Sequence, residues 1–424
     1  MTASDPAPVV GVDVAAVVRI ARALRRHPSF ARRCFTVGEA STSGTRPERW
    51  AGRWAVKEAV RKVYGGRGWA IPAYRLIEVR RAPGQAPTVA VAGREVPGLA
   101  VSLTHDAGVA IAVAVHIAPA TSAQPDMPLA AGHGLRLPDR PTDAHKGTFG
   151  TVLVLAGHRL YPGAPVLCSL GALRGGAGKV RAVVPAGPGG LALFPPEVIV
   201  RGVGAGESGG FAPAALAELV DDLATAQAIA VGPGLGQAEE TGGFLMGLFA
   251  RLTSRATPLV LDADGLNLCA RDPELLARVP PGAVCTPHPA ELARLLGRTV
   301  DAVQADRTGA AAELAVRLDG VVVLKGAGTV IAAADGALDV DPHATAALAV
   351  GGSGDVLTGL VAALLAQGLS PLDAARSGVF IHAEAGSRLA AGRGRSGLLA
   401  SEIAAACVEA QERLRRVGEA TERE

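Results

Sequence analysis

The sequence has 424 residues, of which 49% are hydrophobic and 19% are charged, a composition that is typical of globular domains and excludes a disordered or fibrous chain. The net charge of +3 conceals an asymmetry, because residues 1–117 contain 17 Lys and Arg against 8 Asp and Glu, whereas the other 307 residues contain 25 against 31. The length favours two or three domains, and the opposite signs favour two domains with different partners.

Cysteine usage and apolar runs indicate the compartment. The five cysteines are odd in number and scattered, with no C-x-x-C pair, which favours free thiols in a reducing compartment. The residues after Met1 lack the basic start and long apolar core of a signal peptide. No apolar run reaches the roughly 18 residues that a membrane span needs. We therefore expect a soluble, cytoplasmic protein with no membrane partner.

Residues 9–117 predict a small α+β domain. Its short apolar or alternating stretches are typical of strands, and two stretches have helical periodicity, the second ending at consecutive glycines. The expected strands are VVGVD (9–13), YRLIEVR (74–80), TVAVAG (88–93) and VAIAVAVHI (109–117), and the expected helices run from residue 14 to about 26 and over 50–65.

The sequence pattern changes after this domain. Residues 118–145 carry Pro, Ala and Gly without periodicity, which is typical of a linker. From residue 146, short apolar runs alternate with helical stretches, which predicts an α/β domain whose mostly parallel sheet is covered by helices on both faces. Ligands of such sheets bind beyond the carboxyl ends of the strands. We therefore divide the chain into domains at 1–117 and 133–424, joined by a linker at 118–132.

Two acidic residues of the first domain stand where apolar residues are expected. Asp13 ends an apolar strand and Glu58 lies inside the helix WAVKEAVRK. Two carboxylates brought together at a strand end suit Mg²⁺, which takes one or two protein carboxylates plus phosphate oxygens and water. Lys62 lies one helical turn after Glu58, so an ordinary surface ion pair is the alternative. His105 alone is no more than a histidine at a strand end.

These motifs in this order are informative as a set. GVD, FTVGE (35–39), RWAVKEAVRK (53–62) and SLTHDAG (102–108) resemble holo-acyl-carrier-protein synthase, the phosphopantetheinyl transferase of fatty-acid biosynthesis, over nearly all of 9–117. The resemblance implies that Asp13 and Glu58 bind Mg²⁺ on the pyrophosphate of coenzyme A while a carrier-protein serine attacks the phosphorus. It also implies a phosphate contact for Lys62 and a catalytic role for His105. Lys57 is expected to pair with Glu58 or to help activate the nucleophile.

A basic helix face follows Asp13. Its six arginines have helical spacing or extend the same patch: Arg19, Arg22, Arg25, Arg26, Arg32 and Arg33. A solvated face or a nucleic-acid site is the alternative, but no aromatic residues interleave to stack bases. The resemblance favours an acidic acyl carrier protein as the partner and no nucleic acid. That family is commonly trimeric, so we expect a homo-oligomer with sites between protomers.

The sharpest local signal in the second domain is AVGGSGDVLTG (349–359). Glycines 351, 352 and 354 lead into a helix whose first turn carries Asp355. Backbone amides at a helix N-terminus bind anions, and a carboxylate beside them can take a proton from a hydroxyl while they hold a phosphoryl group. An aspartate that merely caps the helix is the alternative, which the three glycines disfavour.

A series of motifs from HKGTFGTVLVLAG (145–157) through LDADGLN (261–267) and VVLKGAGTVI (322–331) to GGSGD resembles ADP-dependent NAD(P)H-hydrate dehydratase, of the ribokinase-like fold. The match covers about 133–416. The resemblance implies repair of the hydrated cofactors NADHX and NADPHX, by phosphorylation of the ring hydroxyl from ADP or ATP and then loss of phosphate. Two alternatives remain for this half: a vitamin or sugar kinase, and a non-catalytic nucleotide-sensing module.

The resemblance assigns roles to matching residues. It makes Asp355 the base and Gly354 part of the anion hole. The nucleotide segment is Lys325, Gly326, Ala327, Gly328 and Thr329, and the expected contacts to the hydrated dinucleotide are Ala164, Gly234, His288 and Asp355. One segment departs from the family: where N-P-T-G-N is usual, the sequence has DPHAT (341–345). The departure puts the rate, the choice of nucleotide or a monovalent-ion role in question, rather than the fold.

Overall fold

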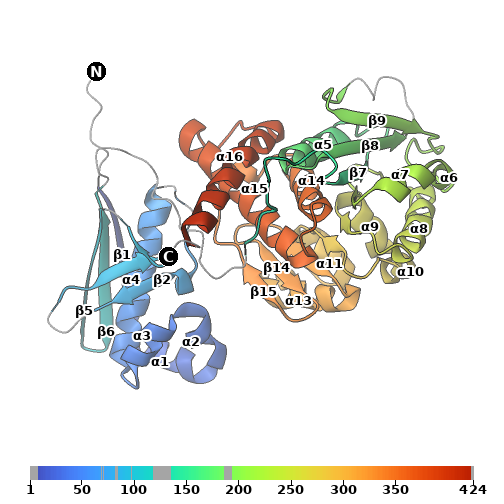
Figure 1. The fold of residues 1–424 in the computed structure, drawn as a ribbon. Coiled ribbons are helices and arrows are strands. Elements are labelled where there is room, and N and C mark those ends of the chain that lie inside the picture. The colour runs from blue at the N-terminus through green and yellow to red at the C-terminus, as the bar shows by residue number, and fades with distance from the viewer. Residues whose placement is uncertain are drawn as a thin grey trace. The chain divides into compact units, whose positions relative to one another are not determined.

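A computed structural model describes residues 8–67, 69, 71–81, 85–96, 98–117, 135–185 and 193–421. The chain forms two compact units, Met1–His133 and Gly134–Glu424 (Figure 1). The predicted linker at 118–132 lies outside the described residues. No helix in the described part of the chain is long and apolar enough to cross a bilayer.

The first unit is an α+β fold, as predicted. A three-stranded antiparallel sheet in the order β1-β6-β5 packs against helix α4, and a second small sheet has the order β2-β3-β4. The elements are β1 (Val9–Ala16), α1 (Val17–Arg26), α2 (Pro28–Cys34), α3 (Val37–Ser43), α4 (Pro47–Arg67), the 3₁₀ helix η1 (Tyr74–Leu76), β2 (Ile77–Arg80), β3 (Thr88–Val91), β4 (Arg94–Glu95), β5 (Leu99–Asp106) and β6 (Val109–His116).

Strand β1 and helix α4 are held unusually close by glycine. A Cβ at Gly11 would overlap the carbonyl oxygen of Ala59, and a Cβ at Gly66 would lie 2.6 Å from Val9 Cγ1. The two contacts show that β1 and α4 run antiparallel, so Asp13 faces the turn of α4 before Ala59. The apolar face of α4 fills the core beneath the sheet, with Ala55, Val56 and other residues fully buried. This packing positions Asp13 over the middle of the helix.

The second unit contains a nine-stranded sheet in the order β15-β14-β13-β12-β11-β10-β7-β8-β9. Strands β7 to β13 pair in parallel, whereas the β13–β14 and β14–β15 pairs are antiparallel. The strands are β7 (Thr151–Leu155), β8 (Lys179–Pro185), β9 (Val198–Val203), β10 (Ala228–Val231), β11 (Leu259–Leu261), β12 (Val284–Cys285), β13 (Val321–Leu324), β14 (Val330–Ala333) and β15 (Leu338–Val340). The strand order reverses between β7 and β10, where a doubly wound sheet opens its ligand crevice.

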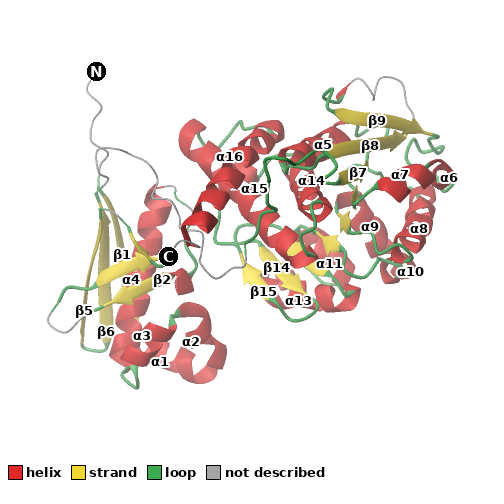
Figure 2. Ribbon diagram, in the orientation of Figure 1, coloured by secondary structure: helices red, strands yellow, loops and turns green. Residues whose placement is uncertain are grey.

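Helices cover both faces of this sheet (Figure 2), which confirms the predicted class. One face packs against α5 (Gly163–Arg174), α14 (Ser353–Ala366) and α15 (Pro371–Arg393), with α16 (Ala400–Thr421) behind. The other elements are α6 (Ala215–Glu218), α7 (Val220–Thr225), α8 (Glu239–Thr253), α9 (Ala263–Arg271), α10 (Pro273–Ala277), α11 (Pro289–Leu296), α12 (Val300–Ala305), α13 (Arg307–Leu318) and the 3₁₀ helix η3 (Ala346–Leu348). The largest apolar core joins the strands to α8, α9, α11 and α13.

Glycines allow helix α14 to pack closely against helix α5. A Cβ at Gly359 would overlap the Cys168 carbonyl oxygen, and a Cβ at Gly171 would overlap that of Val356. The backbones of α5 and α14 therefore touch, and nearly every residue of α14 is buried. Its N-terminus lies at the carboxyl edge of the sheet, where the second candidate site forms.

Candidate active sites

The first candidate site consists of polar side chains at the contact between β1 and α4. Lys62 Nζ lies 2.7 Å from Asp13 Oδ1 and donates to the Val12 carbonyl oxygen at 2.7 Å. Glu58 lies one turn before Lys62 on the same helix face and accepts a hydrogen bond from the Tyr74 hydroxyl at 2.7 Å. The Asp13 side chain is 16% exposed and that of Lys62 is 50% exposed. Two partly exposed carboxylates and one ammonium thus lie on the α4 side of the sheet.

The donor set of this site fits a divalent cation. Asp13 and Glu58 supply carboxylate oxygens, and the Lys62 ammonium already places a positive charge against Asp13. Among the described residues, no group of three or more His, Cys, Asp or Glu could hold a metal ion. Any Mg²⁺ bound here would therefore take the rest of its octahedral shell from phosphate oxygens and water, as Mg²⁺ commonly does.

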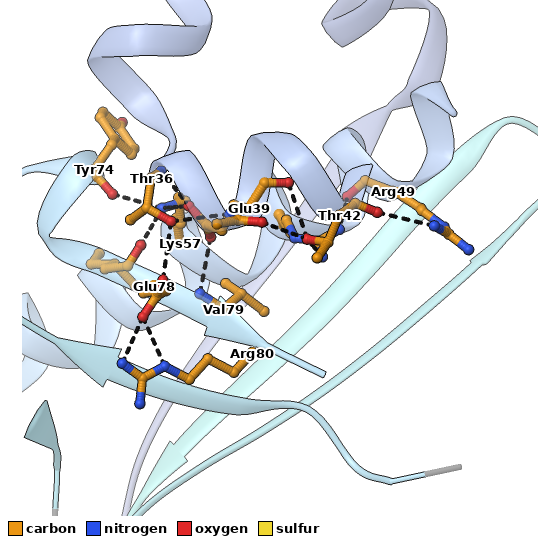
Figure 3. Close-up of polar contacts among 12 residues, drawn as sticks. Thr36, Glu39, Thr42, Arg49, Lys57, Tyr74, Glu78, Val79 and Arg80 are labelled. Carbon is orange, nitrogen blue, oxygen red and sulfur yellow. Dashed lines mark hydrogen bonds and ion pairs between the residues drawn. The ribbon is translucent and has the colours of Figure 1, made fainter. Parts of the chain in front are cut away.

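Lys57 does not pair with Glu58, and that part of the prediction is wrong. Adjacent helix residues face different directions, so Lys57 points into the core, where its side chain is fully buried and its Nζ lies 2.8 Å from Glu39 Oε2. It also donates to the carbonyl oxygens of Tyr74, at 2.8 Å, and Ile77. Figure 3 shows Lys57 and Glu39 pointing toward one another within a polar cluster.

Glu39 is a residue whose role the sequence reading missed. It accepts from the backbone N–H groups of Thr36, at 2.8 Å, and Val79, at 2.9 Å, while Thr36 caps helix α3 (Figure 3). Burial lowers the pKa of Lys57, and the Glu39 charge opposes that shift. This ion pair ties α3, α4 and β2 together, which supports a structural role for the FTVGE motif.

His105 lies on β5, on the same face as Asp13 but two strands away. The register places Asp13 opposite Ala112 and Ala112 opposite Leu103, with His105 two residues further along β5. Standard sheet spacings put the Cα atoms of Asp13 and His105 roughly 12 Å apart. The His105 side chain is exposed, so within one chain it stands beside the carboxylates without contacting them. The six predicted arginines of the basic face are also exposed.

The second site begins at the N-terminus of α14. Gly352 has a φ of +87°, which favours glycine, and forms the N-cap. A Cβ at Gly354 would lie 3.4 Å from Lys325 Nζ, so the lysine ammonium lies against the first turn of the helix. Asp355 follows on that turn. The structure therefore has the predicted combination of backbone amides and a carboxylate, and it adds Lys325 beside them.

Lys325 is held by a carboxylate to which the sequence reading gave no role. Its Nζ lies 2.7 Å from Asp262 Oδ1 and 4.0 Å from Glu291 Oε2. Thr358 donates to the other oxygen of Asp262 at 2.7 Å. Asp262 is 1% exposed and directly follows the buried strand β11; that position, at the carboxyl end of a parallel strand, is the signal in LDADGLN that could have identified it.

The electrostatics suit proton transfer at Asp355. Burial and the nearby Asp262 charge together raise the pKa of Asp355 to about 7, although the Lys325 charge opposes the shift. Burial alone would lower the pKa of Lys325, but Asp262 and Glu291 raise it. Burial, together with the nearby Lys325 and Arg294 charges, lowers the pKa of His288. At neutral pH the site thus combines a lysine cation with a carboxyl group that can exchange a proton.

A cavity of about 460 Å³ joins these groups. Its lining includes Asp355, Gly354 and His288, and the nucleotide segment through Lys325, Gly326, Ala327 and Thr329. The remaining residue of that segment, Gly328, donates its N–H to the His343 carbonyl oxygen at 3.1 Å. Ala164 and Gly234 meet at the β7–β10 switch point, where a Cβ on Gly234 would lie 2.9 Å from Ala164 Cβ. The structure thus brings the predicted dinucleotide contacts to the same edge of the sheet.

The unusual segment 341–345 lines this cavity through a buried histidine. His343 Nδ1 lies 2.8 Å from Asp341 Oδ1 and Nε2 lies 3.3 Å from Glu384 Oε2. Burial alone would lower the pKa of His343, but the two carboxylates raise it to about 10. The backbone of Asp341 bonds to Thr329. The His343 imidazolium therefore links the segment to α15 through Glu384, and backbone hydrogen bonds link the segment to the nucleotide loop.

Comparison with known proteins gives a family for each unit. Residues 152–408 match the NAD(P)H-hydrate dehydratase family, and residues 9–114 match the 4'-phosphopantetheinyl transferase superfamily.

Relatives of the second unit include single-function and bifunctional proteins. The bifunctional NAD(P)H-hydrate repair enzyme Nnr of Thermofilum pendens is 41% identical over 267 residues, which are 62% of this chain and 50% of that protein. The ADP-dependent (S)-NAD(P)H-hydrate dehydratase of Neisseria meningitidis is 41% identical over 273 residues, which are 63% of this chain and 86% of that protein. This chain thus spans about half the length of the bifunctional relatives.

A solved structure shares the fold of the second unit. The ADP/ATP-dependent NAD(P)H-hydrate dehydratase of Bacillus subtilis, co-crystallised with ATP and Mg²⁺, is 31% identical with a TM-score of 0.54. The similarity covers 65% of this chain and 94% of that one.

Proposed function

Because this chain belongs to the NAD(P)H-hydrate dehydratase family and carries a 4'-phosphopantetheinyl transferase superfamily domain, we propose that it is a bifunctional enzyme. Its second unit dehydrates the S-epimer of NADHX or NADPHX with ADP or ATP, which gives NADH or NADPH, AMP or ADP, and phosphate. Its first unit transfers 4'-phosphopantetheine from coenzyme A to a serine of an acyl carrier protein.

The observation that supports dehydration is Asp355 beside the anion-binding turn of α14. We propose that Asp355 takes the proton of the ring hydroxyl as that oxygen attacks the terminal phosphorus of the nucleotide. The bond from that phosphorus to the bridging oxygen breaks, and AMP or ADP leaves. The α14 amides and Lys325 stabilise the transferred phosphoryl group. The C–O bond to phosphate then breaks with the help of the ring nitrogen electron pair, and loss of a ring proton restores the double bond. Asp262 and Thr358 orient Lys325.

For the first unit, Asp13 and Glu58 are the residues that would hold Mg²⁺. When bound, that ion would neutralise pyrophosphate charge. Lys62 lies where it can contact a phosphate oxygen once it leaves Asp13. The serine oxygen forms the new bond to phosphorus, and the bond to the departing 3',5'-ADP breaks. His105 is proposed to act on the same substrate, and the exposed arginines of α1 and α2 to bind an acidic carrier surface.

The outer face of the first unit favours self-association. Val10, Val12 and Val14 are 47–56% exposed on the side of β1 away from α4, and Ile111 beside them is 41% exposed. Contiguous apolar faces of this kind mark interaction sites. We propose that this face packs against copies of the same chain. Light scattering on the Val12→Lys variant tests it, with a smaller particle expected.

Two assays test the proposed functions. Purified protein is incubated with NADHX and ADP or ATP while the absorbance of reduced nicotinamide and the release of phosphate are followed. Dehydration predicts that both rise together, whereas a kinase would accumulate a phosphorylated product and a sensing module would show no turnover. The second assay follows transfer from coenzyme A to apo-carrier protein by mass spectrometry, and an unmodified carrier would contradict the transferase proposal.

A further inference from the structure

A second cavity opens beside the reaction cavity. It has a volume of about 330 Å³, and its lining is entirely polar: Gln237, Asn267, Arg271, His288 and Arg294. His288 lines both cavities, so the two cavities adjoin at this side chain. We name the second cavity the Arg271–Arg294 pocket.

The pocket is built on the carboxyl edge of the parallel sheet. Asn267 and Arg271 lie one turn apart on α9, which follows β11, and Arg294 lies on α11, which follows β12. Arg294 Nη1 donates to Asn267 Oδ1 at 2.8 Å, and Arg271 Nη1 donates to the Gln237 carbonyl oxygen at 3.4 Å. These bonds link two helices and the loop after β10, so the two guanidinium groups are anchored by neutral partners.

The charge of the pocket is positive without compensation from its lining. No carboxylate lines it. The nearby Asp264 accepts hydrogen bonds from Gly236 N–H at 3.0 Å and from Gln237 Nε2 at 2.8 Å. Its carboxylate therefore holds the loop after β10. Among the described residues neither Arg271 nor Arg294 forms an ion pair with a carboxylate, whereas Arg201 and Arg298 of the same unit do. Two guanidinium groups with spare donors suit phosphate, which arginine binds in a bidentate fork.

We propose that the Arg271–Arg294 pocket binds a phosphate group of the hydrated dinucleotide, on the far side of His288 from the reacting ring. The inference rests on the proposed dehydratase function and adds a subsite to it. A dinucleotide offers two sources of phosphate: the pyrophosphate that both NADHX and NADPHX carry, and the 2'-phosphate that only NADPHX carries. We expect the pocket to bind the phosphate equally well in the substrate and in the transition state, and binding of that kind lowers KM without raising kcat.

The test compares steady-state dehydration of NADHX and NADPHX at saturating ADP by three forms of the full chain. These are the unmodified protein, the Arg271→Gln/Arg294→Gln variant and the Arg278→Gln variant. Arg278 is a matched control, because it is exposed on the same unit and lines neither cavity. Both pocket side chains are also exposed, and coincident thermal transitions would confirm that the variants fold. We expect the double variant to raise KM by about tenfold or more, since hydrogen bonds to charged groups contribute about 1.5–3 kcal/mol.

The substrates separate the two sources of phosphate. A KM raised for NADPHX alone assigns the pocket to the 2'-phosphate, and a KM raised equally for both substrates assigns it to the pyrophosphate; either result supports the inference. A double variant whose two KM values match those of Arg278→Gln would overturn it. Failure of the dehydratase proposal is distinct, because the unmodified protein would then convert neither substrate.

Discussion

Among the described residues, each unit has a lysine that pairs with a buried carboxylate, and the two pairs differ in how exposed the lysine is. Lys57 and Glu39 are fully enclosed by the core of the first unit. Lys325 and Asp262 are as close, at 2.7 Å against 2.8 Å, but the Lys325 side chain is 21% exposed and lines a cavity beside Asp355. The Lys57–Glu39 pair therefore holds helices together, whereas the Lys325–Asp262 pair leaves its ammonium group accessible from the cavity. Access to a cavity, rather than the ion pair itself, distinguishes Lys325 from Lys57.

The largest expected effects come from replacing each lysine by methionine. Lys57→Met leaves Glu39 buried without a counter-charge, so we expect a loss of about 3–5 kcal/mol in the free energy of unfolding of the first unit. Hydrogen exchange of the α4 amides in the full chain measures it. Lys325→Met should instead lower kcat/KM for dehydration by about 10²- to 10³-fold, with a smaller change in stability.

A second substitution on each pair sharpens this contrast. Lys57→Met/Glu39→Met removes both charges, and we expect it to recover most of the lost protection, since apolar replacements of buried pairs are often tolerated. Lys325→Met/Asp262→Met should recover no activity. Recovery of dehydration in the latter variant would show that the Lys325 pair is structural, and the comparison would fail.

The pH dependence of dehydration tests the role of Asp355, which lies beside the Lys325–Asp262 pair in the cavity. The pKa of Asp355 is raised to about 7, and the group must be ionised to accept a proton. We therefore expect kcat/KM to fall about tenfold per pH unit below pH 7 and to level off above it. Asp262→Asn removes a negative neighbour and should move the midpoint to lower pH. A profile that stays flat between pH 6 and 8 in the unmodified protein would contradict the assignment.

A smaller effect, on thermal stability, is expected from the interactions of His343 with Asp341 and Glu384. The pKa of His343 is raised above the ordinary value of 6.5 to about 10, so its stabilising contribution is fully present below pH 6.5 and is lost as pH rises through 10. We expect His343→Gln to lower the Tm by about 3 °C at pH 6 and to leave it unchanged at pH 10.5. Scanning calorimetry measures this, with the exposed His145→Gln as the control. A Tm difference that persists at pH 10.5 would contradict the role of an imidazolium.

The smallest effect is expected on the basic face of the first unit. Arg22→Glu/Arg26→Glu should raise the KM for apo-carrier protein by about tenfold at low ionic strength, and the difference should shrink at high salt because the charges are exposed. Arg94→Glu, on β4, is the matched control. Kinetics that do not change with ionic strength would exclude this docking surface.

Much of the fold was predictable because it depends on local patterns. The apolar runs gave the parallel strands, and the glycines before Asp355 gave the helix start. Boundaries were less accurate: the predicted strand at 74–80 begins with the 3₁₀ helix η1, and the predicted helix at 50–65 spans Pro47–Arg67. Single-sequence patterns place such ends poorly, because packing decides where a helix frays.

The partners of the charged residues were less predictable, since they lie far apart in the sequence. Thr358 reaches Asp262 across 96 residues, and His343 reaches Glu384 across 41. Lys57 was expected to pair with its neighbour Glu58, but the helix turns the two side chains in different directions. Such contacts depend on how the elements pack, which no local pattern reports.

The most direct test of the central claim is the dehydration of NADHX with ADP by the unmodified protein and by Asp355→Asn. The substitution keeps the shape of the side chain and removes the proton acceptor. We predict that absorbance of reduced nicotinamide returns with the unmodified protein and that Asp355→Asn slows this by about 10³-fold, while transfer from coenzyme A is unchanged. Equal dehydration rates for the two proteins would contradict the claim that Asp355 is the base.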